Sequence, residues 1–217
     1  QEFMGYEFHV NEHVLIPRQD TEILVEEADR AADDTGAKRI LDVCTGSGCI
    51  LLSLLKMNEN RTGTGSDLSE PALKMAEENR RLLEIPEERA AFVQSDLFER
   101  IEGTYDMIVS NPPYIRTEEI RKLQEEVRLH DPYGALDGKE DGLYFYRRII
   151  SEAGGYFEHQ GTLLFEIGYD QAEDVKRLME EAGYSQIYVK KDLAGLDPVV
   201  GGVYNKAREN EEELTNV

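Results

Sequence analysis

An α/β domain with a mostly parallel sheet is the fold class that the sequence predicts. Short apolar runs typical of buried strands alternate along the chain with longer helical segments. Strands separated by helices pair in parallel, with helices on both faces of the sheet. A chain of 217 residues suffices for one such domain with a full hydrophobic core. We expect a seven-stranded sheet in one domain over residues 18–217, preceded by a β-hairpin within residues 1–17.

The first elements are a hairpin and a helix. Residues 6–10 and 13–16 alternate around Asn11 and Glu12, which predicts a β-hairpin. Residues 1–3 stand before a methionine and are interpreted as a remnant of cloning. Asp20 or Thr21 can cap a helix that ends near Gly36.

The remaining elements follow as a regular series. The strands are expected at residues 39–43, 62–66, 90–94, 105–110, 162–167, 187–190 and 199–204. The helices are expected at residues 50–57, from Ser69 or Pro71 to residue 83, at 142–157 and at 171–182. A polar segment at residues 118–139 contains Pro132 and Gly134, which predicts a short helix and a loop over the site.

The charge of the chain disfavours a nucleic-acid partner. Its 24 Lys and Arg against 45 Asp and Glu give a net charge of −21, with no dense basic cluster. The acidic residues at 22–34 and 209–213 are interpreted as solvated surface. A cytoplasmic protein is expected, because the sequence shows neither a membrane span nor a signal peptide. We also expect a monomer. Its two cysteines, Cys44 and Cys49, predict neither a disulfide nor a metal site.

Polar residues and glycines follow four of the predicted strands. Residues 42–48 end the first strand, Asp67 the second, Asp96 the third and Asn111 the fourth. In parallel sheets, ligands bind beyond the carboxyl ends of the strands, where the strand order reverses. This convergence predicts a nucleoside-binding crevice.

The glycine loop at residues 44–48 favours S-adenosylmethionine over other nucleotide cofactors. It allows close approach of backbone to a ligand, but Leu51 departs from the dinucleotide fingerprint and no Gly-Lys-Ser/Thr follows. Asp67 can accept hydrogen bonds from both ribose hydroxyls. Asp96 can accept from an adenine amino group or cap the following turn, and Leu97 can pack on the ring.

Asn111, Pro112, Pro113 and Tyr114 form a loop suited to hold a planar amino group. The two prolines fix two φ angles and remove two N–H donors, so the loop offers mainly acceptors. Adenine, cytosine and glutamine amino groups all fit this description. An Asn-Pro turn that merely closes a strand is the alternative interpretation.

The chain resembles the protein-(glutamine-N5) methyltransferases of the HemK/PrmC type, which modify the glutamine of the Gly-Gly-Gln motif in release factors. The resemblance covers nearly all of residues 6–204. Its most specific parts are Leu-Ile-Pro-Arg at residues 15–18 and Asp-Leu-Ala-Gly at residues 192–195, since Asn-Pro-Pro-Tyr also occurs in adenine-N6 methyltransferases. Further matching segments lie at residues 41–50, 95–98, 108–115, 135–138, 141–143, 146–150 and 166–168.

The resemblance implies a Rossmann-like class I methyltransferase fold, with S-adenosylmethionine as cofactor, S-adenosylhomocysteine as product and release factors as protein substrates. The cofactor-contacting positions are then Cys44, Thr45, Gly46, Ser47, Gly48, Asp67, Leu68, Asp96, Leu97 and Asn111. The family usually has Gly in place of Cys44 and Arg in place of Pro198. Its members also carry a helical N-terminal domain, so this chain is expected to be the catalytic domain alone.

The expected mechanism rests on positioning, because the lone pair of an amide nitrogen is delocalised. Asn111 and the Pro112 carbonyl would accept the two amide hydrogens, and Tyr114 would pack against the amide plane. No histidine at position 9, 13, 130 or 159 is expected to act as a base. Arg18, Glu22 and Glu166 could shape the site, but ion pairing or capping explains each of them at least as well, and residues 144–146 are interpreted as core. The alternatives are an adenine-N6 methyltransferase of nucleic acid and a noncatalytic cofactor-binding scaffold.

Overall fold

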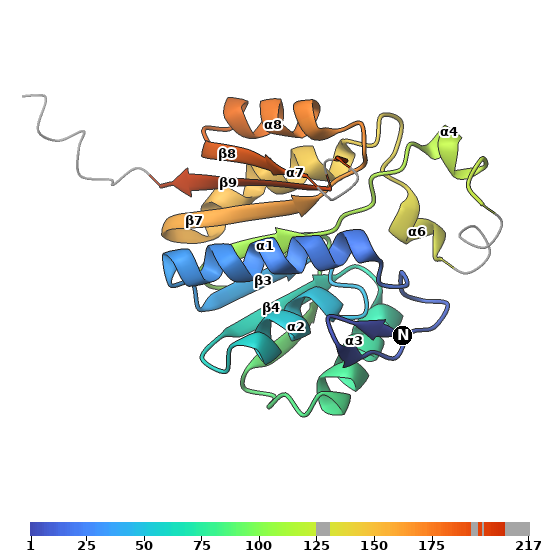
Figure 1. Ribbon diagram of the computed structural model, residues 1–217, viewed down its shortest axis with the longest axis vertical. Helices are drawn as coiled ribbons and strands as arrows, with labels where there is room; N and C mark the ends of the chain where they lie inside the picture. The colour runs from blue at the N-terminus through green and yellow to red at the C-terminus, as the bar shows by residue number, and fades with distance from the viewer. Residues whose placement is uncertain (125–130, 192–194, 197, 207–217) are drawn as a thin grey trace, which may run out of the picture.

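The main sheet has seven strands, as the sequence predicts, and its middle strand is β6 (Figure 1). The computed structural model describes residues 1–124, 131–191, 195, 196 and 198–206; His130, residues 192–194 and the acidic tail at 209–213 lie outside this range. The strands of this sheet are β3 (Arg39–Val43), β4 (Thr62–Asp67), β5 (Ala90–Gln94), β6 (Tyr105–Ser110), β7 (Phe157–Glu166), β8 (Ser185–Lys190) and β9 (Val199–Asn205).

The strand order is β5-β4-β3-β6-β7-β9-β8. The first five strands in this order run in parallel, whereas β9 runs antiparallel to both β7 and β8. The order reverses beside β3, so that the chain leaves β3 toward β4 and later returns to its other side with β6. This arrangement confirms the predicted fold class and places a topological switch point between β3 and β6.

Helices cover both faces of the sheet. They are α1 (Gln19–Thr35), α2 (Cys49–Met57), α3 (Glu70–Leu82), α4 (Thr117–Ile120), α6 (Tyr133–Leu136), α7 (Tyr144–Ala153) and α8 (Ala172–Glu181). Because side chains alternate along a strand, Met107 and Val109 pack in the core with α1 and α2, whereas Ile108 packs in the core with α7 and α8. The short helices α4 and α6 lie beyond the carboxyl end of β7 (Figure 1).

The start of α1 differs from the prediction. The residue that precedes the helix is Arg18, and no side chain caps it, whereas Asp20 and Thr21 lie inside the first turn. The Thr21 hydroxyl donates instead to a buried carboxyl on β7. The helix does end at Gly36, whose φ of 73° suits a glycine. The sequence therefore identified the helix but assigned its first polar residues to the wrong task.

The N-terminal hairpin is earlier and shorter than predicted. It consists of β1 (Glu2–Phe3) and β2 (Tyr6–Glu7), while residues 13–16 form no strand. Phe3 is 1% exposed and packs edge-on against Phe8, with ring centroids 5.9 Å apart. Burial of Phe3 therefore anchors the hairpin to the core.

The strand β7 is longer than predicted. Its first residue is Phe157, because α7 ends at Ala153 and a 3-10 turn at Gly154–Tyr156 leads directly into the strand. The sequence predicted a helix up to residue 157 and left residues 158–160 unassigned, but β9 pairs with this end of β7, as in the Gln160 and Asn205 pair. Strand pairing therefore overrides local preference here. Among the described helices, none is long and apolar enough to cross a membrane.

Candidate active site

A cavity of about 380 Å³ lies beyond the carboxyl ends of β3, β4 and β6. Its lining includes Cys44, Thr45, Gly46, Ser47, Asp67, Leu68, Asp96, Leu97, Asn111 and Pro113. The structure thus brings together residues from all four predicted strand ends. Gly48, Pro112 and Tyr114 complete the predicted set and are not among the described residues that line this cavity.

The glycine loop between β3 and α2 makes one wall of the cavity. Gly46 and Gly48 have φ angles of 53° and 78°. Gly48 begins α2, and a Cβ on it would lie 3.1 Å from Leu52 and 3.2 Å from Ala76. Both glycines are therefore needed for the shape of the loop. The Thr45 hydroxyl donates to Asp42 at 2.6 Å, and burial raises the pKa of Asp42 to about 7.

Cys44 adopts the same left-handed conformation, with φ of 63°, which explains why glycine suits this position. Its thiol is half-buried and packs beside the core that α7 and α8 cover. Burial raises the pKa of the Cys44 thiol well above its ordinary value. This residue is accordingly a neutral packing group and a poor nucleophile.

We predict that Cys44→Val destabilises the protein while Cys44→Gly is tolerated. A β-branched side chain is strongly disfavoured at positive φ, so Cys44→Val should lower the free energy of unfolding by about 1–3 kcal/mol. Urea unfolding without added ligand measures the difference. Cys49→Val is the matched control, because Cys49 is buried in α2 and has ordinary helical geometry. Equal effects of the two valine substitutions at positions 44 and 49 would contradict the backbone explanation.

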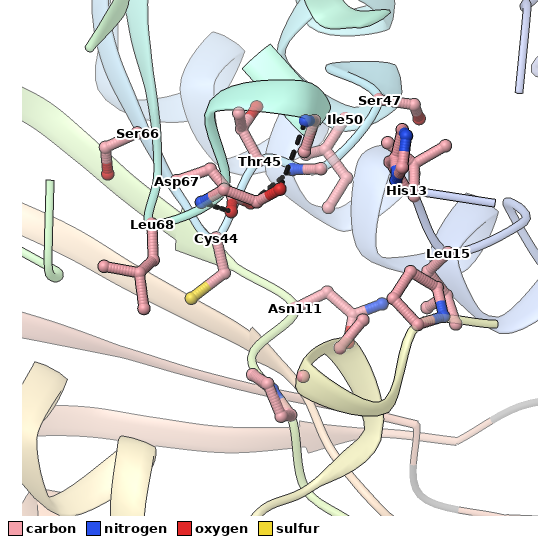
Figure 2. A pocket seen from close by; sticks show the side chains of 18 of the residues that line it. His13, Leu15, Cys44, Thr45, Ser47, Ile50, Ser66, Asp67, Leu68 and Asn111 are labelled. Atoms are coloured by element: carbon pink, nitrogen blue, oxygen red, sulfur yellow. Dashed lines mark hydrogen bonds between the residues drawn. The ribbon is translucent and has the colours of Figure 1, made fainter. Parts of the chain in front are cut away.

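Asp67 at the end of β4 organises the loop from below (Figure 2). One carboxylate oxygen accepts the Gly46 N–H at 3.0 Å, and the other accepts the Ser69 N–H at 2.8 Å. Burial raises the pKa of Asp67, and the backbone N–H donors oppose this shift. Each carboxylate oxygen has a further lone pair, so the side chain can still accept hydrogen bonds from a ligand.

Asp96 and Leu97 follow β5 and occupy another part of the wall. Asp96 forms an ion pair of 2.8 Å with Arg148 on α7. The side-chain cap of the following turn comes from Ser95, whose hydroxyl accepts from the Arg100 N–H at 3.0 Å. Leu97 is buried and has a positive φ of 52°. The sequence allowed Asp96 either to bind an adenine amino group or to cap the following turn. In the structure the side-chain cap of this turn is Ser95.

The loop at residues 111–114 leaves β6 at the switch point. Asn111 and Pro113 line the cavity, whereas the Tyr114 hydroxyl donates to Glu166 at 3.4 Å. The Gln171 amide holds this loop by donating to the Tyr114 carbonyl at 3.0 Å. A Cβ on Gly138 would lie 2.7 Å from the Tyr114 backbone, which shows how closely the following segment packs on the loop.

A buried carboxyl group, Glu166, lies behind this loop. It is 2% exposed, and it accepts a hydrogen bond of 2.6 Å from the Thr21 hydroxyl. The Thr21 hydroxyl is also 3.4 Å from the side-chain nitrogen of Asn111. Sequence reasoning treated Glu166 as an ion-pairing or capping group and gave Thr21 a capping role. The position of Glu166 at the end of a predicted strand was the available signal for its place at the site.

Two further segments close the cavity, and the second of them belongs to residues 118–139, which the sequence predicted to lie over the site. The first contributes His13, Val14, Leu15 and Pro17, of which His13 and Leu15 are labelled in Figure 2. The second contributes Pro132, Gly134 and Ala135. An ion pair of 2.7 Å between Arg18 and Asp131 joins the two segments. The Leu-Ile-Pro-Arg motif was recognised as specific to the family, but no pattern in the sequence showed that it lies beside the cavity.

Asn79 on α3 ties the N-terminal segment to the glycine loop. Its Oδ1 accepts the His9 N–H at 2.7 Å, and its Nδ2 donates to the His9 carbonyl at 3.0 Å and to the Ser47 carbonyl at 2.9 Å. Asn79 is fully buried.

Over the part of the chain that the structure describes, no group of three or more His, Cys, Asp or Glu side chains is placed to hold a metal ion.

Comparison with known proteins identifies the family. A family model described as "Methyltransferase small domain" matches residues 19–128. The release factor glutamine methyltransferase of Clostridium acetobutylicum is 44% identical over 202 residues, which cover 92% of this chain and 70% of that protein. This chain belongs to the release factor glutamine methyltransferase family. The family resemblance that the sequence motifs indicated is thereby confirmed.

Other members of the release factor glutamine methyltransferase family agree. The relative from Fusobacterium nucleatum is 40% identical over 215 residues, which cover 98% of this chain and 60% of that protein. A solved structure of the release factor-specific protein-(glutamine-N5) methyltransferase from Alicyclobacillus acidocaldarius is 31% identical with a TM-score of 0.54. That alignment covers 92% of this chain and 100% of the solved one.

Proposed function

We propose that this chain transfers a methyl group from S-adenosylmethionine to the side-chain amide nitrogen of a glutamine in peptide-chain release factors. The observation that carries this proposal is that Asn111 and Asp67 line one cavity. One offers an amide oxygen to a planar amino group, and the other offers a carboxylate to a ribose. Membership of the methyltransferase family indicates the reaction between the two bound groups, which is methyl transfer.

The residues present fit the cofactor. The cavity volume of about 380 Å³ lies within the usual range of small-molecule sites. Asp67 would hold the ribose hydroxyls, Leu68 and Leu97 would flank the adenine, and the loop at residues 44–48 would hold the amino acid part. Asp67 and Asp96 line the cavity with acidic groups, which suits a ligand that carries a positive charge. When bound, S-adenosylmethionine supplies an electrophilic methyl group on a sulfonium sulfur.

The protein's own residues would position the substrate amide. The Asn111 Oδ1 would accept one amide hydrogen and the Pro112 carbonyl the other, which favours positive charge on the nitrogen in the transition state. Neither Pro112 nor Pro113 has an N–H that would compete for these acceptors. Tyr114 supports the loop through Glu166 and Gln171. A nitrogen that gains positive charge becomes acidic, so solvent suffices to remove its proton.

The function is tested by methyl transfer from labelled S-adenosylmethionine to a release factor. We expect label in the wild-type factor and none in a factor whose Gly-Gly-Gln glutamine is replaced by alanine. Adenine-containing DNA and RNA serve as parallel acceptors. Label in nucleic acid alone would contradict the proposal and support the adenine-N6 alternative. Cofactor binding without transfer to any acceptor would instead support a noncatalytic scaffold.

A further inference from the structure

The Asn111 amide nitrogen faces two buried side chains, Thr21 and Glu166. Thr21 on α1 and Asn111 after β6 both line the cavity, whereas Glu166 at the end of β7 is not among the described residues that do so. Thr21 and Glu166 are 3% and 2% exposed. The carboxyl group is therefore too deeply placed to exchange a proton with a substrate directly, and its influence must pass through its neighbours.

Glu166, Thr21 and Asn111 form a hydrogen-bonded array. When Glu166 is ionised, the donors and acceptors of this array can be arranged in only one way. A carboxylate only accepts hydrogen bonds, so the Thr21 hydroxyl must donate to it across their 2.6 Å contact. The Thr21 oxygen can then only accept, and the group that faces it at 3.4 Å is the Asn111 Nδ2. Since the amide nitrogen faces this array, the Asn111 Oδ1 is directed away from it.

We infer that Glu166 is a positioning residue that acts through the Thr21 hydroxyl to keep the Asn111 Oδ1 directed at the cavity. The array prevents the alternative amide rotamer, which would present two N–H donors to a substrate amino group that is itself a donor. The effect on turnover rests on the proposed function, whereas the orientation of the Asn111 amide does not.

Protonation of Glu166 would weaken this arrangement, because a carboxylic acid can donate to Thr21 and free the hydroxyl hydrogen to turn. Burial raises the pKa of Glu166 to about 7, and hydrogen bonds from Thr21, Tyr114 and Asn111 oppose the shift. Other titratable groups around Glu166 are Asp20, Tyr114, Tyr146 and Cys49. Arg18 acts on the adjacent Tyr114. Turnover should accordingly rise with pH through about 7, where the ionised form becomes dominant.

Substitutions at Thr21 test the array through kcat and KM. Thr21→Val keeps the shape but removes the hydroxyl, and should lower kcat about 10–100-fold, because small errors of position are costly in transfer reactions. The KM for the release factor and the cofactor Kd should change less than about threefold. Thr21→Ser restores the hydroxyl and should recover most of the rate. Thr35→Val, at the exposed far end of α1, is the matched control.

Glu166→Gln and nuclear magnetic resonance test the array without relying on turnover. In protein labelled with ¹⁵N at asparagine, the Asn111 side-chain signal is assigned by its absence in Asn111→Ala. It should titrate with a midpoint near 7 in the wild type and lose this step in Glu166→Gln. The decrease of kcat at low pH should also disappear in the Glu166→Gln variant.

The possible failures are distinguishable. A wild-type protein that transfers no methyl group to release factors would overturn the proposed function, while the titration of Asn111 would still decide the orientation. An Asn111 signal that does not respond to Glu166 would overturn the inference. Turnover of Thr21→Ser as low as that of Thr21→Val would also overturn it, by showing that Thr21 acts through its packing.

Discussion

Replacing Asn111 by alanine is expected to lower kcat for glutamine methylation roughly 10²–10³-fold. The substitution removes an acceptor that stabilises charge on the amide nitrogen, and loss of one such preorganised group typically costs about this much. Binding of S-adenosylmethionine should weaken less than about threefold, because Asp67 and the glycine loop remain. Single-turnover transfer to a release factor and calorimetric titration with the cofactor measure the two quantities separately.

Two further variants sharpen the Asn111 prediction. Asn111→Asp keeps the size and one oxygen but places a second carboxyl group beside Glu166, so it should also be slow. Asn205→Ala is the matched control. Asn205 is exposed at the end of the sheet away from the cavity, where it pairs with the first half of β7. Near-normal turnover of Asn111→Ala would contradict the amide-holding role. A loss of cofactor affinity as large as the loss of kcat would assign Asn111 to cofactor binding.

Replacing Asp67 by alanine is expected to weaken S-adenosylmethionine binding about 10–100-fold. A hydrogen bond to a charged group contributes about 1.5–3 kcal/mol, and the carboxylate also fixes the Gly46 and Ser69 N–H groups. Turnover at saturating cofactor should fall much less than affinity. Because burial raises the pKa of Asp67, acidification should protonate it and weaken wild-type binding as well. Isothermal titration calorimetry across pH measures both effects.

The matched control for Asp67 lies at the opposite end of the strands, near the start of β6. Asp106 also accepts two backbone N–H groups, from Lys38 and Arg39, both at 2.8 Å. Asp106→Ala removes a comparable hydrogen-bonding group away from the cavity, so it should leave cofactor affinity unchanged. Asp67→Asn keeps one oxygen but turns an amide N–H toward one of two backbone donors, and should bind nearly as weakly as Asp67→Ala. Equal loss in the Asp106 variant would show that Asp67 acts only through stability.

The sheet was predictable because its strands carry strong local signals. Strands β3, β5 and β6 begin and end at the predicted residues, since each is an apolar run bounded by polar or turn residues. The N-terminal hairpin was misplaced because residues 6–10 and 13–16 alternate as strands do. Burial of Phe3 beside Phe8 instead fixes the earlier pairing. That contact is tertiary, and periodicity alone does not report it.

The site was predictable where residues lie at strand ends, and unpredictable where distant segments meet. Asp67 and Asn111 follow strands directly, so parallel pairing brings them to one edge. Thr21 and Glu166 are 145 positions apart, and their contact depends on how α1 crosses β7. The Tyr114 hydroxyl faces Glu166, a contact that the motif does not report. Motif spacing does not contain such orientations, which packing determines.

The three hydrogen bonds of Asn79 have a consequence for the entropy of ligand binding. They fix His9 and Ser47 relative to α3. The backbone on this side of the cavity is therefore ordered before any ligand arrives. Ordering the backbone of one residue costs about 1–2 kcal/mol of conformational entropy. Because this wall is already ordered, the cost belongs to folding and is not part of the binding free energy. Binding then retains a larger share of its contact energy as affinity.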